Sequence, residues 1–177
     1  MVLRSPYRRI VLICWADRER PEREAPCRQQ MQAAKSELSS EEPHLTTPTN
    51  VPLRPSAIRP PFGRYHHGIA VSTGSRFVYT SGQLGVRADD SVPETIEEQA
   101  EICFEAIRAI LAEGGMDLAD IVRLSAFVTK REDMRRYMAV RDRYVSDPLP
   151  ASTLFIVSGF TRPEFLVEVE AVAARAD

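Results

Sequence analysis

From residue 60 onward, apolar and polar positions follow patterns that predict short strands and two helices. Residues 68–72 and 76–81 are strand-like and flank a turn signal at 73–75, so we expect a β-hairpin there. Residues 82–86 indicate a bend followed by a short further strand. The start of this region is therefore predicted to consist of β structure.

Two later segments show the 3.6-residue spacing of amphipathic helices. The first begins with a capping box, Thr95 and Glu98, and ends at Gly114 and Gly115. Its apolar stripe consists of Ile96, Ala100, Cys103, Ile107, Ile110 and Leu111. The second helix is predicted for residues 131–145. Its inner side is expected to carry Met134, Tyr137, Met138, Arg141 and Tyr144.

Three more strand-like segments complete the pattern, at residues 121–129, 152–158 and 165–173. The order of elements is then β-β-(β)-α-β-α-β-β. This order predicts an α+β domain in which both helices cover one face of a largely antiparallel or mixed sheet.

The first third of the chain has a different character. Nine of the 13 prolines fall within the first 61 residues, which also show almost no periodic apolar pattern. We therefore expect residues 1–57 to be disordered or loosely structured, and residues 58–177 to form one domain. The apolar run at 10–16 is too short to cross a membrane, and no small-residue cleavage site of a signal peptide follows it.

Charge and cysteine content argue against several classes of protein. Residues 1–60 carry 10 Lys and Arg and 7 Asp and Glu, whereas residues 61–177 carry 13 and 18, a net charge of −5. An acidic domain has no electrostatic footprint for nucleic acid, which disfavours binding to RNA or DNA. Cys14, Cys27 and Cys103 show no metal-ligand spacing and no disulfide framework, and Cys103 is expected to be a buried, inert thiol. We expect a cytoplasmic protein that binds no membrane.

Two carboxylates, Glu168 and Glu170, lie inside the apolar strand at 165–173 and project from the same face of it. Such a charged pair is costly unless it is solvated, partnered or used. Glu168 could activate or position a water as a general acid or base, or it could belong to a solvated face or to an ion pair at a subunit interface. Glu170 is expected to be structural or interfacial.

The adjacent histidines His66 and His67 face opposite ways in an extended segment, and the sequence offers no third ligand near them. A metal site is therefore not expected. One of the two could line a cleft as a base.

Five blocks of residues, in order along the chain, resemble the signature of the Rid (YjgF-like) family of reactive-intermediate deaminases. The blocks are Arg64-Tyr65-His66-His67-Gly68, Val78-Tyr79-Thr80-Ser81-Gly82-Gln83, Gly114-Gly115 with Leu118-Ala119-Asp120-Ile121-Val122, Pro150-Ala151, and Val167-Glu168-Val169-Glu170-Ala171. The resemblance implies a chorismate-mutase-like α+β fold and a homotrimer whose sheets pack inward, with clefts between subunits. It also implies hydrolysis of enamine or imine small molecules to a 2-oxo acid and ammonia, without a cofactor or metal.

The same resemblance implies roles for individual residues. It implies that the Tyr65 hydroxyl lines the cleft, although on spacing alone Tyr65 could equally be a core aromatic residue. It implies that Ser81 and Gly82 shape the pocket, and that Glu168 positions a water. An Asn is common on the second helix near the cleft, but Met138 stands there in this chain.

The largest departure from the family pattern is Ser152. Active deaminases of the family have an Arg after the Pro-Ala pair, and that Arg binds the substrate carboxylate through two hydrogen bonds. Each of these hydrogen bonds contributes about 1.5–3 kcal/mol to the binding free energy. We therefore expect a substrate other than the usual 2-imino acids. Arg162, in the loop before the last strand, is either a replacement cation supplied by a neighbouring subunit or an exposed, solvated side chain.

Two other functions remain open at this point. The first is a non-catalytic trimer that binds a small molecule or a protein on the same scaffold. The second is an endoribonuclease, which fits poorly with the acidic domain and with the absence of a suitably placed histidine.

Overall fold

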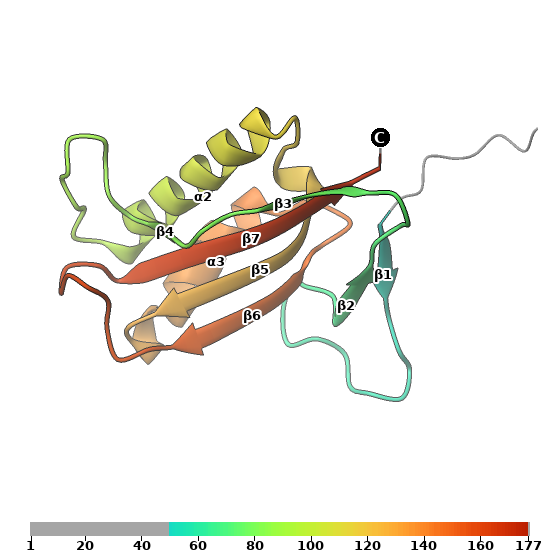
Figure 1. Ribbon diagram of the computed structural model, residues 1–177. Helices are drawn as coiled ribbons and strands as arrows, with labels where there is room; N and C mark the ends of the chain where they lie inside the picture. The colour runs from blue at the N-terminus through green and yellow to red at the C-terminus, as the bar shows by residue number, and fades with distance from the viewer. Residues whose placement is uncertain (1–49, 177) are drawn as a thin grey trace, which may run out of the picture. The chain divides into compact units, whose positions relative to one another are not determined.

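The computed structural model describes residues 50–176, and the statements below refer to these residues (Figure 1). Most of the extension predicted for residues 1–57 therefore lies outside the described residues. Its last part does contain regular structure, because Val51–Leu53 forms strand β1. In residues 50–176, no helix has the length and apolar character needed to cross a membrane.

A mixed five-stranded sheet forms the centre of the fold, with the strand order β3-β7-β5-β6 and with β4 also paired to β7. The strands are β3 Arg76–Tyr79, β4 Gln83–Leu84, β5 Ile121–Val128, β6 Ala151–Ile156 and β7 Val167–Arg175. Strand β7 runs antiparallel to β3, β4 and β5, whereas β5 and β6 are parallel. This arrangement confirms the predicted mixed sheet.

Two helices, α2 (Ile96–Glu113) and α3 (Met134–Tyr144), cover the same face of that sheet (Figure 1). Short 3-10 turns, η2 (Leu118–Asp120) and η3 (Arg131–Asp133), precede β5 and α3. The Thr95 hydroxyl accepts a hydrogen bond from the backbone of Glu98, as the capping box predicts. The observed architecture is the α+β fold expected from the sequence.

The core lies between the helices and strands β5 and β7. On α2 the fully buried residues are Ile96, Gln99, Ala100, Cys103, Phe104, Ile107 and Leu111. The predicted stripe is therefore confirmed, except that Ile110 is only half-buried. Cys103 is buried as expected, and burial raises the pKa of its thiol to about 12.

On α3 one predicted inner residue is wrong. Met134 is exposed because it is the first residue of the helix, ahead of the turns that reach the core through Tyr137 and Val140. Arg141 is buried as predicted, and its guanidinium pairs with the neighbouring carboxylate of Asp142.

The hairpin predicted for residues 68–81 is also wrong, although its turn exists. Gly74 adopts a φ of 83°, and the Ser75 amide donates to the Ser72 carbonyl at 3.3 Å. Strand β2 (Gly68–Ala70), however, pairs with β1, and β3 pairs with β7. A local pattern identifies strands but not their partners, and here the partner of β3 is a buried apolar strand about 95 residues further along the chain.

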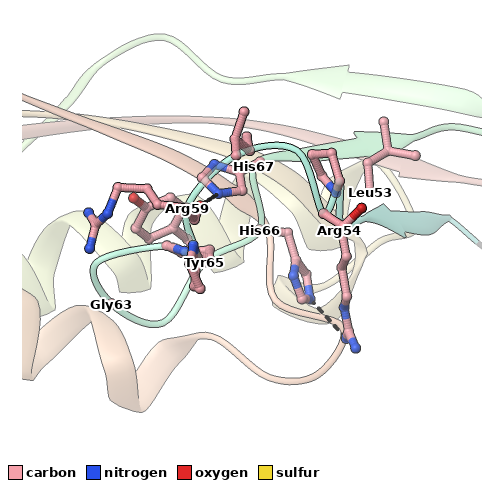
Figure 2. A pocket seen from close by; sticks show the side chains of 12 residues that line it. Leu53, Arg54, Arg59, Gly63, Tyr65, His66 and His67 are labelled. Atoms are coloured by element: carbon pink, nitrogen blue, oxygen red, sulfur yellow. Dashed lines mark hydrogen bonds between the residues drawn. The ribbon is translucent and has the colours of Figure 1, made fainter.

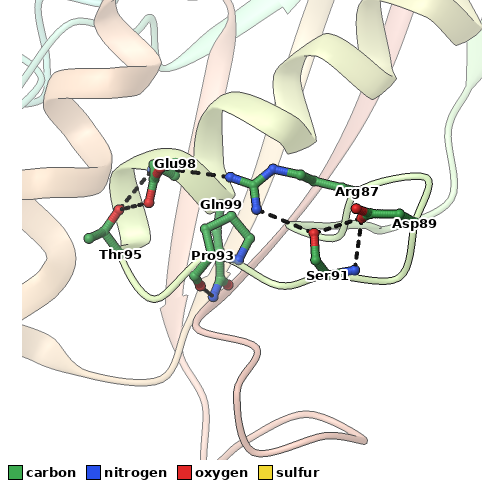
Figure 3. Close-up of polar contacts among 7 residues, drawn as sticks. All are labelled: Arg87, Asp89, Ser91, Pro93, Thr95, Glu98 and Gln99. Carbon is green, nitrogen blue, oxygen red and sulfur yellow. Dashed lines mark hydrogen bonds and ion pairs between the residues drawn. The ribbon is translucent and has the colours of Figure 1, made fainter.

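The buried amide of Gln99 links α2 to the loop before α2 and to the loop before β7; Figure 3 shows the first of these contacts, with Pro93. The Gln99 Nε2 donates to the carbonyls of Pro93, at 2.7 Å, and Glu164, at 2.9 Å. Its Oε1 accepts from the backbone N–H of Leu166 at 2.8 Å. Gly85 lies so close to Gln99 that a Cβ there would collide with it. Gln99 therefore fixes the segment that enters β7, two residues before Glu168.

We expect Gln99→Leu to lower the free energy of unfolding by about 2–5 kcal/mol, because it leaves two carbonyls and one N–H buried without partners. Urea unfolding followed by circular dichroism measures this change. Arg108→Gln, on the exposed side of the same helix, is the control and should change stability by less than about 1 kcal/mol. Equal midpoints for the two variants would contradict a fixing role for Gln99.

Candidate functional site

Glu168 lies near the start of β7, between β4 and β5. Its cross-strand neighbours are Leu84 and Phe127. The carboxylate lies against the backbone of Gly82, where a Cβ would overlap its Oε1. Only glycine fits at position 82 while Glu168 keeps this position, so the structure brings Ser81, Gly82 and Glu168 together as one group.

The Glu168 side chain is half-buried. Within residues 50–176 it forms neither an ion pair nor a side-chain hydrogen bond, so its oxygens are available to a water, a ligand or a partner subunit. Its negative charge also contributes, after burial, to the raised pKa of the Cys103 thiol.

A second group forms around the start of β6. The His66 amide donates to the Pro150 carbonyl at 3.1 Å, and His66 forms a parallel bridge with Ala151. These contacts bring the segment that contains Tyr65 beside the start of β6, which carries Ser152. The structure therefore unites the Tyr65 block with the Pro-Ala-Ser block.

Met138 on α3 belongs to the same group. A Cβ at Gly63 would lie 3.5 Å from the Met138 Cε, so the loop that leads to Tyr65 passes directly over this methionine. The Tyr65 hydroxyl accepts a hydrogen bond from the Phe62 amide at 3.2 Å. Tyr65 is half-buried in this loop and is not a residue of the buried core.

Glu168 and Ser152 face opposite sides of the sheet. Glu168 is in register with Phe127, on the face away from the helices, whereas Ser152 is in register with the core residue Leu124. Glu168 and Ser152 are also two strands apart in the sheet and are offset by three residues along the strand direction. At ordinary strand spacing this offset separates their Cα atoms by about 14 Å. One chain therefore does not bring the two groups together.

Arg162 lies in the loop before β7. Its guanidinium pairs with the Glu164 carboxylate at 2.6 Å and stacks over the Phe165 ring, 4.9 Å from the centroid. The charge of Arg162 is thus already matched by a carboxylate of its own loop.

The face of the sheet opposite the helices is not covered by another element of residues 50–176 (Figure 1). It carries two stacked aromatic pairs, Phe77 with Tyr79 and Phe127 with Phe155, with centroids 6.1 and 5.5 Å apart. Tyr79 is 71% exposed. A row of large apolar side chains in water is typical of a surface that binds another protein chain.

A pocket of about 480 Å³ lies beside Tyr65 and is lined by 12 residues between Leu53 and His67 (Figure 2). His67 donates from Nε2 to the Arg59 carbonyl at 2.8 Å, and the Arg54 guanidinium lies 3.5 Å from the His66 Nε2. Partial burial, and then the charge of Arg54, lower the pKa of His66 below its usual value, while Asp147 acts in the opposite direction.

The two histidines point in different directions in the pocket, as predicted for an extended segment (Figure 2). In residues 50–176 there is no group of three His, Cys, Asp or Glu side chains that could hold a metal ion. This pocket was not predicted from the sequence. The signal that could have found it is the repeated Arg-Pro pair at 54–55 and 59–60, just ahead of Tyr65.

Comparisons with known proteins identify the family to which this chain is similar. The family model for Endoribonuclease L-PSP matches residues 56–175. RutC family protein SSO3206 of Saccharolobus solfataricus is 30% identical over 118 residues, which cover 66% of this chain and 90% of that protein. The 2-iminobutanoate/2-iminopropanoate deaminase of Dermatophagoides farinae is 27% identical over 125 residues, 70% of this chain and 91% of that protein.

Solved structures give the same result. The crystal structure of Escherichia coli TdcF with bound serine is 27% identical, has a TM-score of 0.54, and is matched over 66% of this chain and 91% of TdcF. YyfB of Yersinia pestis, a member of the conserved Rid protein family, has a TM-score of 0.62 at 21% identity, over 70% of this chain and 97% of YyfB. The second likeness concerns the fold alone.

Proposed function

Because this chain belongs to the Rid (YjgF-like) family, we propose that it hydrolyses an enamine, an imine or a related C–N small molecule and releases ammonia. The observation that carries the proposal is the Glu168 carboxylate, which is half-buried, lies against Gly82 and has no partner in residues 50–176.

In the proposed reaction a water adds to the imine carbon. Glu168 accepts a proton from that water as the C–O bond forms and gives it to the nitrogen, which yields a carbinolamine. As the C–N bond breaks, Glu168 takes the proton of the new hydroxyl group, so that the C=O bond forms, and passes it to the departing nitrogen. The products are a carbonyl compound and ammonia, so the atoms balance without a redox partner. An enamine substrate first takes up a proton at carbon and gives up a proton from nitrogen to become the imine.

We propose a homotrimer as the active form, with each cleft built from two subunits. One subunit would supply Glu168, Ser81 and Gly82, and its neighbour would supply Tyr65, Met138 and Ser152. Two features support this: Glu168 and Ser152 face opposite sides of one sheet, and the uncovered face carries the aromatic pairs that a subunit contact would bury.

The proposed substrate differs from the usual small 2-imino acids. Ser152 has no charge with which to hold a carboxylate, and Met138 gives the cleft an apolar wall. Arg162 stays a proposed source of positive charge from the neighbouring subunit, although its pair with Glu164 would have to open or be shared.

The proposal is tested by measuring ammonia formed from 2-aminoacrylate that a second enzyme generates in the same cuvette, together with the mass of the protein by light scattering. Turnover by a trimer supports the hydrolase. If neither the wild type nor Ser152→Arg releases ammonia above the uncatalysed rate, the deaminase proposal fails. The alternative, a non-catalytic binding trimer, is favoured by the missing Arg at position 152.

An endoribonuclease is not proposed, even though the family model carries that name. Residues 61–177 have a net charge of −5, and RNA binding depends mainly on neutralising phosphates.

A further inference from the structure

The pocket beside Tyr65 is positively charged in an otherwise acidic domain. Its lining includes Arg54, Arg59, His66 and His67, and no aspartate or glutamate. Residues 61–177 as a whole carry five more acidic than basic side chains. A pocket of this kind concentrates positive potential where the rest of the domain repels anions.

Neither arginine forms an ion pair within the described part of the chain, although the Asp147 carboxylate lies near enough to His66 to act against the lowering of its pKa. Arg54 contacts only the His66 ring, and Arg59 lies over the Phe62 ring, 3.6 Å from its centroid, without a carboxylate partner in residues 50–176. Arg162, by contrast, already has Glu164. The two pocket arginines thus keep their hydrogen-bond donors available for an anion.

The remaining walls of the pocket are apolar and stiff. Leu53 and Ile58 supply aliphatic surface, and Pro55, Pro60 and Pro61 restrict the backbone. A volume of about 480 Å³ is in the range of pockets that hold ligands of drug size and exceeds what a three- or four-carbon acid fills. The pocket therefore has room for a ligand with a large apolar body.

The position of the pocket links it to the missing family arginine. Arg54 contacts His66, and the His66 amide donates to the carbonyl of Pro150, two residues before Ser152. In Figure 2, Arg59 extends on the same side of the pocket as Tyr65, and Arg54 lies on the other side beside His66. Position 152 lacks the arginine of the family pattern, but Arg54 and Arg59 place positive charge on both sides of the Tyr65 block.

We propose that the pocket lined by residues 53–67 binds a carboxylate with a large apolar or aromatic body, and that Arg54 and Arg59 provide its positive charge. The inference rests on the proposed function, because it names the substrate class of the same cleft: imines and enamines of acids with bulky side chains. The bulky body contacts the proline-rich wall, and the carboxylate meets one of the two guanidinium groups, which lie on different sides of the pocket.

Isothermal titration calorimetry with three probes tests the proposal on the full-length protein. Phenylpyruvate has the carboxylate and the ring, phenylacetone has the ring without the carboxylate, and pyruvate has the carboxylate without the ring. We expect phenylpyruvate to bind at least about tenfold more tightly than either, since phenylacetone lacks the charge-assisted contact and pyruvate lacks the apolar one.

The arginine variants supply the second arm of the test. Arg54→Gln/Arg59→Gln should weaken phenylpyruvate binding by about 10–100-fold and leave phenylacetone binding nearly unchanged. Arg64→Gln is the matched control, because Arg64 is in the same loop, does not line the pocket and contacts only the Asp142 carbonyl. Thermal unfolding of each variant shows whether the fold is retained.

The outcomes separate this proposal from the proposed function. Wild-type affinity in the double variant, or equal binding of phenylpyruvate and phenylacetone, overturns the anion pocket. If phenylpyruvate binds as expected but no imine is hydrolysed, the pocket stands and the hydrolase fails. Turnover of 2-aminoacrylate with no phenylpyruvate binding overturns the pocket and leaves the hydrolase in place.

Discussion

Replacement of Glu168 by glutamine is expected to lower kcat for ammonia release by about 10²–10⁴-fold, the usual contribution of a positioned general acid or base. Glutamine keeps the volume that lies against Gly82, so the packing of β4 on β7 should be preserved. It cannot accept and return a proton, so the loss should fall on kcat and leave KM nearly unchanged. Steady-state ammonia release measures both constants.

Glu170→Gln is the matched control, because Glu170 lies on the same strand and the same face, opposite Ser125. It borders a small hollow with Tyr79 and Arg123, and it plays no part in the proposed reaction. We expect its kcat to stay within about threefold of the wild type, which corresponds to less than 1 kcal/mol of the barrier. Equal losses in both variants, at unchanged mass by light scattering, would argue that Glu168 acts on assembly and not on chemistry.

Ser152→Arg should raise kcat/KM for 2-aminoacrylate by about 10²–10⁴-fold. Two charge-assisted hydrogen bonds to a substrate carboxylate, at about 1.5–3 kcal/mol each, account for a gain of that size. Position 152 lies on β6 beside the Tyr65 block, where an arginine could reach the proposed cleft. The same assay that measures Glu168→Gln measures this gain.

Ser152→Gln distinguishes the charge from the length of the new side chain. Its planar amide donates hydrogen bonds without a positive charge, so we expect a much smaller gain than with arginine. A gain that is equal for Gln and Arg would mean that the site responds to volume and not to charge. No gain for Arg, in a wild type that does release ammonia, would contradict a carboxylate-binding role for position 152.

Local physical chemistry explains why much of the fold can be predicted from the sequence. The capping box at Thr95 and the glycines at 114–115 define α2 because a helix must satisfy its terminal N–H and C=O groups. The alternation through β7 identifies a half-buried strand because side chains alternate between its faces. Both signals are contained within a few residues, so no knowledge of the partner elements is needed.

Features that depend on residues far apart in the sequence were not predicted, or were predicted wrongly. The pairing of β3 with β7 replaced the expected hairpin, because cross-strand packing and not the turn at Gly74 chooses the partner. Gln99 looks like an ordinary polar residue of an amphipathic helix. It is buried because Pro93 and Glu164 on two separate loops offer carbonyls at the same point.

The sequence by itself determined the family, the order of elements and the residue types of the candidate site, because motifs and periodicities are properties of the order of residues along the chain. Only the tertiary structure decided how those residues are grouped. Glu168 joins Gly82, and Tyr65 joins Ser152 on the other side of the sheet, because strand register sets which face each side chain occupies. The positive pocket beside Tyr65 also exists only in three dimensions, since it forms where the chain between residues 53 and 67 folds back on itself.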